Sequence, residues 1–292
     1  MPRPNPLSDS LRTLCRHLPL LAGFQGLALV LAFLGTAGVR ANLHALLDHS
    51  LYADTLLHGL DAGALAEILA NPGMGSFGAA LAPSFWTGIL FALASLVLMP
   101  GVFKAYAEPA PLGREAFFRA CGRNLGRFVR LALVHLGIAC ALGGILLGIQ
   151  EAVVTHVQRT TPEVLPFFLR LGGAAITFVL LSWLRLWFDL ARAQVVVRDQ
   201  GAVRRALAAT FRQPFRHPLR LLGAYVFIGL LGLGCLLAGI GVWHALVPPA
   251  SVAGAFLVGQ GTLFLGMACR FWQRALAVRH LDAVREASAP DC

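Results

Sequence analysis

Residues 221–242 read LLGAYVFIGLLGLGCLLAGIGV and contain no charged side chain. An α-helix rises about 1.5 Å per residue, so this segment is long enough to cross the roughly 30 Å hydrocarbon layer of a membrane. The surface helix of a soluble protein keeps a polar face toward water, and this segment has none. The stretch therefore predicts a transmembrane helix.

Five further apolar segments resemble this one in length and composition. They are Leu18–Val39, Pro83–Phe103, Leu131–Gln150, Phe167–Leu184 and Ala245–Cys269. Hydrophobic residues make up 57% of the chain and charged residues only 13%, about half the charged fraction of a soluble domain. We therefore expect an all-α, polytopic membrane bundle of six transmembrane helices, forming a single integral membrane domain over residues 1–292.

The positive charges lie almost entirely on one side of these six spans. Of the 24 Lys and Arg residues, all except Arg40, Arg159 and Arg170 fall at the two termini or in the segments after spans two and four. Cytoplasmic segments of membrane proteins carry this excess, so both termini are predicted to be cytoplasmic. A net charge of +10 placed at span ends also argues against nucleic-acid binding. The richness in Arg, Ala and Gly indicates a bacterial protein, hence the cytoplasmic (inner) membrane.

The segments before spans one, three and five are similar to one another. Arg12 aligns with Arg212 at an offset of 200, and Arg123 aligns with Arg212 at an offset of 89. Spans four and six also match at an offset of 85. Tandem copies of one unit, a short amphipathic helix followed by a span out and a span back, explain these matches; the alternative is coincidence, because Arg is common at inner span ends. The predicted copies are residues 7–104, 112–192 and 200–281.

The segment before span three is the clearest amphipathic helix. Phe117, Phe118 and Phe128 share one face, and arginines line another. Attraction to an anionic leaflet is worth about 1 kcal/mol per basic residue, more than the about 0.2–0.5 kcal/mol lost per pair of like charges. One interpretation therefore puts this helix on the inner headgroups with its phenylalanines toward the acyl chains; the other packs it on neighbouring spans with its arginines in water. The predicted lipid-headgroup contacts are Arg119, Arg123, Arg127, Arg130, Arg212 and Arg216.

Three ionisable residues are the intramembrane polar candidates: His135, Arg185 and Asp189. Arg185 and Asp189, with Arg192, have the i,i+4 and i,i+3 spacing of ion pairs, and their place at the inner end of span four favours an anchoring and folding role. His135 lies well inside span three. An interhelical hydrogen bond is expected there, and a proton relay is the alternative.

Small residues four apart indicate helix-packing faces in several spans. Gly144 and Gly148 have this spacing in span three, as do Gly234 and Ala238 in span five. We expect neighbouring helices to approach closely at these positions.

No pattern in the chain predicts catalysis, a cofactor or a metal site. Residues 41–83 form the longest outer segment, and they read as surface helices with a solvated polar face rather than a metal site, since no specific ligand spacing occurs. The six cysteines form no C-x-x-C pair, and no phosphate loop or paired catalytic carboxylates appear. The His and acidic residues of the outer segment are His44, Asp48, His49, Asp54, His58, Asp61 and Glu67.

Two blocks carry a family resemblance. Residues 118–131 read FRACGRNLGRFVRL, and residues 189–207 read DLARAQVVVRDQGAVRRAL, with FRHP at 215–218. They resemble uncharacterised bacterial six-span membrane proteins and are loosely similar to the membrane domain that precedes some glycerophosphodiester phosphodiesterases. No phosphodiesterase domain is present here, so the resemblance implies a membrane domain without that activity.

The sequence thus predicts a non-catalytic membrane or complex component that contacts anionic lipid on the cytoplasmic side. Its expected partners are membrane lipids, other membrane proteins or a second copy of the chain. The alternative is a transporter of a lipid or small solute. A membrane-embedded enzyme ranks last, because no candidate catalytic groups are visible.

Overall fold

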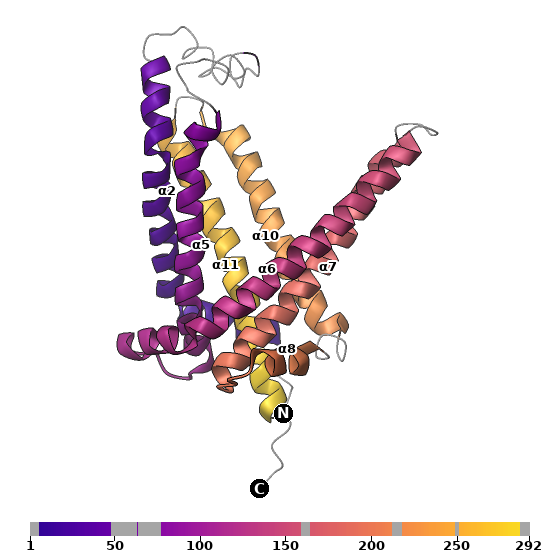
Figure 1. Cartoon of the computed structure of the whole chain (residues 1–292). Coiled ribbons are helices and arrows are strands. Elements are labelled where there is room, and N and C mark those ends of the chain that lie inside the picture. Colours follow the sequence, from indigo (N-terminus) through magenta and orange to yellow (C-terminus); the bar gives the residue numbers. More distant parts are fainter. Residues whose placement is uncertain are drawn as a thin grey trace. The chain divides into compact units, whose positions relative to one another are not determined.

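The computed structural model of the chain describes residues 6–47, 63, 77–158, 164–211, 218–248 and 251–286. Over these residues the chain forms helices and no strand, so the all-α prediction is confirmed. The helices are α1 (Pro6–Arg16), α2 (Leu18–Leu47), α5 (Phe77–Ala107), α6 (Arg114–Gln158), α7 (Val164–Val197), α8 (Val203–Phe211), α10 (Pro218–Leu246) and α11 (Val252–Glu286) (Figure 1).

Six of these helices are long and apolar enough to cross a membrane, as predicted: α2, α5, α6, α7, α10 and α11. Their apolar side chains are mostly exposed, which reverses the pattern of a soluble protein. In α6, no residue of the most apolar 18-residue window is buried. Leu133, Leu136 and Ile145 are typical exposed residues of that helix. Surfaces of this kind are stable only against hydrocarbon, so the chain is an integral membrane protein.

The chain divides into two compact units. The first unit comprises Met1–His17, Leu96–Gly232 and Cys269–Cys292, and the second comprises Leu18–Ser95 and Leu233–Ala268. Helices α5, α10 and α11 contribute residues to both. Each unit therefore joins segments that are far apart in the sequence. The predicted single domain over residues 1–292 stays a prediction.

The core of the first unit is built from matching positions of the helices that return to the basic side. Phe103 of α5, Phe188 of α7 and Gln273 of α11 are all buried, and they are spaced at the same interval of 85 residues. The positions two and three residues further along are buried in all three helices as well: Ala105, Leu190 and Ala275, then Tyr106, Ala191 and Leu276. A repeated unit would produce this common register, although the three-copy repeat itself stays a prediction.

The amphipathic segment before span three is not a separate short helix, which corrects one part of the predicted repeat. Helix α6 runs without interruption from Arg114 to Gln158 and contains both the segment and the span. The positions of the prolines explain why this segment is continuous with its span and the equivalent segments are not. The equivalent segments break where Pro19 follows α1 and where Pro218 begins α10, but residues 114–131 contain no proline.

Helix α1 is held against α11 within the first unit. The indole Nε1 of Trp272 donates to Ser10 Oγ at 2.9 Å, and Arg279 Nε donates to Thr13 Oγ1 at 2.9 Å. Ser10 and Thr13 are buried, whereas Arg12 and Arg16 on the same helix are exposed. The amphipathic pattern of α1 thus serves protein packing on one face and solvent on the other.

Close helix approaches in the second unit occur at glycines other than the predicted ones. A Cβ added at Gly239 of α10 would lie 2.9 Å from Thr262 Cβ of α11, and one added at Gly35 of α2 would lie 3.2 Å from Thr87 Cβ of α5. Nothing lies within 4 Å of a Cβ added at Gly144, Gly148 or Gly234, so the prediction that these glycines mark packing faces is wrong. Spacing within one helix does not say which face meets a neighbour.

Substitution of Gly239 by alanine is expected to destabilise the second unit by about 1–3 kcal/mol, the usual range for overpacking. Both γ atoms of Thr262 lie within 2.7 Å of the added methyl, so rotation of the threonine does not relieve the clash. Gly234→Ala on the same helix is the matched control, since its methyl would meet open space. Thermal unfolding in detergent, followed by tryptophan fluorescence, measures both variants. Equal stability of the two would contradict the close α10–α11 approach.

Candidate functional site

The strongest polar feature of the first unit is a buried carboxylate near the carboxyl-terminal end of α7. The side chain of Asp189 is only 2% exposed. Its Oδ1 accepts a hydrogen bond from Arg192 Nη1 at 2.9 Å, and its Oδ2 accepts one from the Tyr225 hydroxyl of α10. The predicted i,i+3 pairing of Asp189 with Arg192 is therefore present, and Tyr225 is an additional partner.

Arg192 extends this network to α6. Its Nη2 donates to His135 Nδ1 at 3.2 Å, and the His135 ring stacks on Phe188 with centroids 4.5 Å apart. The interhelical hydrogen bond expected for His135 is thus present. The nitrogen that faces Arg192 must be unprotonated to accept this bond, so any proton on the neutral ring lies on Nε2.

The network also reaches α11. Gln273 Nε2 donates to the backbone carbonyl of Tyr225 at 3.0 Å. Hydrogen bonds therefore join α6, α7, α10 and α11, with Tyr225 bonded to Asp189 through its hydroxyl and to Gln273 through its backbone carbonyl. The guanidinium charges of Arg185 and Arg274 also act on the Asp189 carboxylate. Between Arg185 and Asp189, however, the described part of the chain forms no ion pair.

Aromatic side chains fix the short helix α8 beside this network. Trp187 Nε1 donates to the carbonyl of Leu207 in α8 at 3.0 Å, and its ring lies 5.1 Å from the Phe211 ring. Trp187 also contacts Phe188, which stacks on His135. Trp187, which holds α8, is therefore linked to His135 of the polar network through the ring of Phe188.

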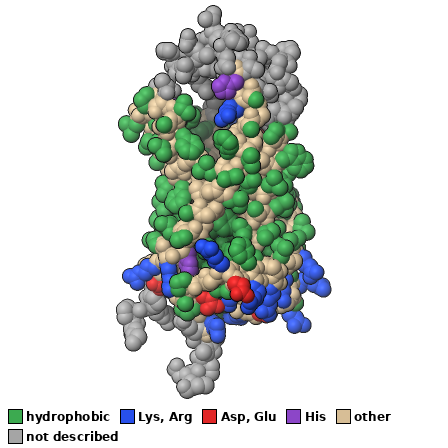
Figure 2. Space-filling view, turned by 90° about the vertical axis from the view of Figure 1, so that its left-hand side faces the viewer, with side chains coloured by type: hydrophobic (Ala, Val, Ile, Leu, Met, Phe, Trp, Pro, Cys, Tyr) green, Lys and Arg blue, Asp and Glu red, His purple; other side chains and the backbone are tan. Residues whose placement is uncertain are grey.

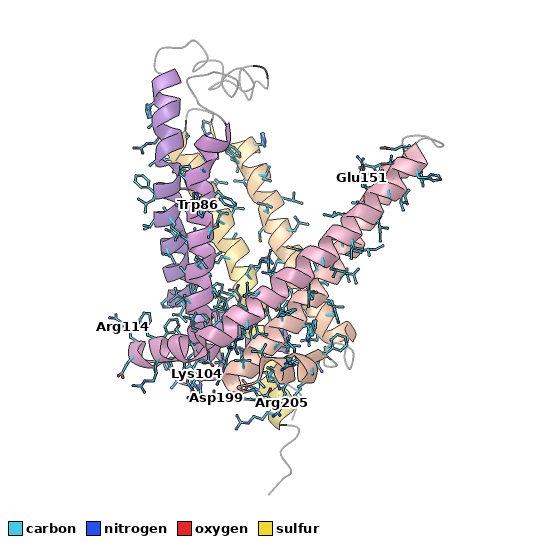
Figure 3. The ribbon with its side chains drawn as sticks, in the orientation of Figure 1. Trp86, Lys104, Arg114, Glu151, Asp199 and Arg205 are labelled. Carbon is cyan, nitrogen blue, oxygen red and sulfur yellow. The ribbon has the colours of Figure 1, made fainter. Side chains whose placement is uncertain are left out.

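Four of the six arginines predicted to contact lipid headgroups lie in the first part of α6, and two of these four bind a carboxylate of this chain. Arg127 Nη1 lies 2.8 Å from Asp199 Oδ1, and Arg123 pairs with Asp199 Oδ2. Asp199 lies on the connection between α7 and α8 (Figure 3). Its φ of 46° is in the left-handed region, which Asp tolerates better than most residues. The turn after α7 thus presents this carboxylate to α6.

The other predicted headgroup contacts differ in their surroundings. Arg119 pairs with Glu115 of the same helix, and both side chains are highly exposed. Arg130 is exposed and forms no ion pair with any residue that the structure describes. Arg212 and Arg216 lie outside the described residues. Among the four described arginines, Arg130 is therefore the one that is exposed and has no ion pair.

The apolar face of the same segment packs on protein, so its predicted exposure to acyl chains is wrong for Phe128. Phe128 is fully buried and meets Phe103 of α5 edge-on, with centroids 5.9 Å apart. Phe117 lies against Gly101 of α5, where an added Cβ would be 2.6 Å from its ring. Only Phe118, 62% exposed, matches the lipid-facing prediction. The alternative interpretation, a helix packed on its neighbours, describes most of this face.

Asp199→Asn is expected to lower the melting temperature at neutral pH, and the difference is expected to disappear in acid. The hydrogen bond from Arg127, together with the charges of Arg123 and Arg127, holds the pKa of the Asp199 carboxyl below its usual value. The stabilisation is therefore complete above the unfolded-state pKa of about 3.9, and it is lost as the pH falls through the lowered folded-state pKa. Asparagine keeps the size and tolerates the turn conformation, so only the charge is removed.

The measurement is thermal unfolding of both proteins across this pH range. Glu115→Gln is the control, because it removes an exposed i,i+4 pair from the same helix without freeing the α7–α8 turn. A pH-independent difference between wild type and Asp199→Asn would contradict the ion-paired clamp.

The predicted outer segment lies largely outside the described residues, although α2 continues to Leu47 and α5 begins at Phe77. Over the described residues, no group of three or more His, Cys, Asp and Glu side chains could hold a metal ion. His44 is exposed near the end of α2. The surface helices expected in residues 41–83 stay a prediction.

Comparisons with protein-family models, with curated proteins and with solved structures find no match to this chain. The class defined by the fold is an all-α integral membrane protein, with six long apolar helices in the part of the chain that the structure describes. The resemblance to the membrane domain of some glycerophosphodiester phosphodiesterases stays a prediction.

Proposed function

We propose that this protein is a non-catalytic component of the bacterial inner membrane, with both termini in the cytoplasm and its basic side in contact with anionic lipid. The observation that carries the proposal is the position of the charges. On the face in Figure 2, Lys and Arg side chains gather below hydrophobic ones. One end of the first unit carries Lys104 and Arg205, together with Asp199, and Glu151 lies at the opposite end (Figure 3). Cations gathered at one end of apolar helices match the cytoplasmic side of a membrane.

The interaction energies of the exposed α6 arginines favour lipid phosphate over their present ion-pair partners. An exposed ion pair such as Arg119–Glu115 contributes about 0–1 kcal/mol, while an anionic leaflet attracts each basic residue by about 1 kcal/mol. Arg130 has no ion pair to give up. These two arginines are therefore the proposed contacts, whereas Arg123 and Arg127 are held by Asp199.

The test is the lipid that co-purifies with the protein. Arg119→Gln/Arg130→Gln is expected to lower the ratio of phosphatidylglycerol to phosphatidylethanolamine in mild detergent extracts, measured by mass spectrometry. Arg170→Gln is the matched control. Arg170 is similarly exposed, but it forms an ion pair with Glu151, which lies at the opposite end of the first unit. An unchanged ratio in the double variant, or an equal fall in the control, would contradict the proposed lipid contact.

The second candidate is a transporter of a lipid or small solute. It is favoured by the polar network around Asp189, because ionisable residues within a span often line a transport path. A water-filled path would expose His135. A cysteine placed at this position, in a chain without other cysteines, should then react with a charged maleimide; failure to react would favour the non-catalytic component.

A further inference from the structure

Positive charge exceeds negative charge around Asp189. Arg185, Asp189 and Arg192 lie on one face of α7, because they are four and three residues apart. Arg274 of α11 follows Gln273, whose amide donates to the backbone carbonyl of Tyr225, the residue whose hydroxyl binds Asp189. The charges of Arg185 and Arg274 act on both Asp189 and Tyr225. Arg192 therefore binds this carboxylate directly, and the charges of two further guanidinium groups act on it.

Two of these three guanidinium groups have no anionic partner. Arg192 uses its two terminal nitrogens for Asp189 and His135. Arg185 and Arg274 are half-buried, and neither donates a hydrogen bond or forms an ion pair within the described ranges. The Arg274 guanidinium lies over the Phe271 ring, 4.9 Å from its centroid, a contact that leaves its positive charge without a counter-ion. Both lie within apolar helices that cross the membrane, and each repels the other. The excess positive charge of these guanidinium groups is unfavourable inside a membrane unless an anion binds to them.

The chemistry of that anion follows from the two arginines and their depth. Each is two residues from a tryptophan, Trp187 in α7 and Trp272 in α11, and tryptophans in spans prefer the headgroup level. Phosphate groups of the leaflet lie at the same level. Guanidinium groups bind phosphate oxygens through paired, charge-assisted hydrogen bonds.

We propose that Arg185 and Arg274 form a binding site for one phosphate group at the inner ends of spans four and six. The ligand is either the phosphate of an anionic lipid headgroup or a free phosphate, and the two sources share this chemistry. The site uses none of the α6 arginines of the proposed lipid contact. Failure of one proposal therefore leaves the other standing.

The experiment titrates the purified full-length chain in detergent with phosphatidylglycerol, with phosphatidylcholine and, separately, with inorganic phosphate. Native mass spectrometry counts bound lipid, and calorimetry measures phosphate. The test variant is Arg185→Gln/Arg274→Gln, and the control is Arg170→Gln, which removes an exposed arginine that pairs with Glu151 and belongs to neither proposed contact. Loss of two charges near the headgroups is expected to weaken phosphatidylglycerol binding about thirtyfold. Phosphatidylcholine binding is expected to change far less, because its headgroup carries no net charge.

The results of these titrations distinguish a lipid headgroup from a free phosphate as the ligand. A selective loss of phosphatidylglycerol in the test variant but not in the control supports a lipid headgroup; loss of phosphate binding alone supports a free phosphate. Equal affinities in wild type and test variant for both ligands would overturn the site. If the double variant does not fold, Arg274→Lys replaces it, because lysine keeps the charge but not the paired geometry. Severalfold weaker binding by Arg274→Lys supports the site, and unchanged binding overturns it.

Discussion

Replacing Asp189 by alanine is expected to lower the free energy of unfolding by about 3–5 kcal/mol, the largest effect of any polar substitution in the first unit. The substitution removes the acceptor of Arg192 and of the Tyr225 hydroxyl together. It leaves Arg192, whose side chain is 16% exposed, without a counter-charge beside His135. Titration with a denaturing detergent, followed by tryptophan fluorescence, measures the loss.

Two further variants distinguish the ion pair from a general packing defect. Tyr225→Phe removes one hydrogen bond to a charged group and should cost about 1.5–3 kcal/mol, less than Asp189→Ala. Asp189→Ala combined with Arg192→Ala should lose less than the sum of the two single variants, by about 0.5–3 kcal/mol. Strict additivity, or a small effect of Asp189→Ala, would contradict a network that depends on the buried charge.

Phe128→Ala is expected to lower the free energy of unfolding by about 3–5 kcal/mol, as other buried Phe→Ala substitutions do. Phe128 is fully buried at the start of span three and packs edge-on against Phe103 of α5. Removal of the ring would leave a cavity between α5 and α6, because neighbouring helices relax only partly. The same unfolding titration in detergent measures this loss.

Phe118→Ala on the same helix is the matched control. Phe118 is 62% exposed, so its truncation should change the stability by no more than about 0.5 kcal/mol. Similar effects of the two substitutions would mean that both rings face lipid or detergent, and would restore the interpretation in which this helix lies on the membrane surface.

The six spans could be predicted from the sequence because hydrocarbon imposes a length and a composition on each crossing helix. The ends of the helices could not be predicted in this way, because polar residues can continue a helix beyond the hydrocarbon layer without a cost in free energy. Helix α2 thus extends to Leu47 rather than Val39, and α6 begins at Arg114 rather than near Leu131.

The partners of the site residues could be predicted only where the contacts are local; for His135 an interhelical hydrogen bond was expected, but not its partner Arg192. The Asp189–Arg192 pair follows from i,i+3 spacing on one helix. Tyr225 lies 36 residues from Asp189, and Arg123 lies 76 residues from Asp199, so no spacing rule connects them. A tyrosine in an otherwise apolar span was the one sequence signal for Tyr225. Arg274 had a weaker signal, because it occupies the position of Asp189 at the offset of 85.

The most direct test of the account is the side of the membrane on which the carboxyl terminus lies. Two reporters fused after Cys292, a green fluorescent protein that fluoresces only in the cytoplasm and an alkaline phosphatase that is active only in the periplasm, report opposite locations. With six spans and cytoplasmic basic ends, cells should fluoresce and show no phosphatase activity. Active phosphatase with dark fluorescent-protein cells would contradict the proposed orientation.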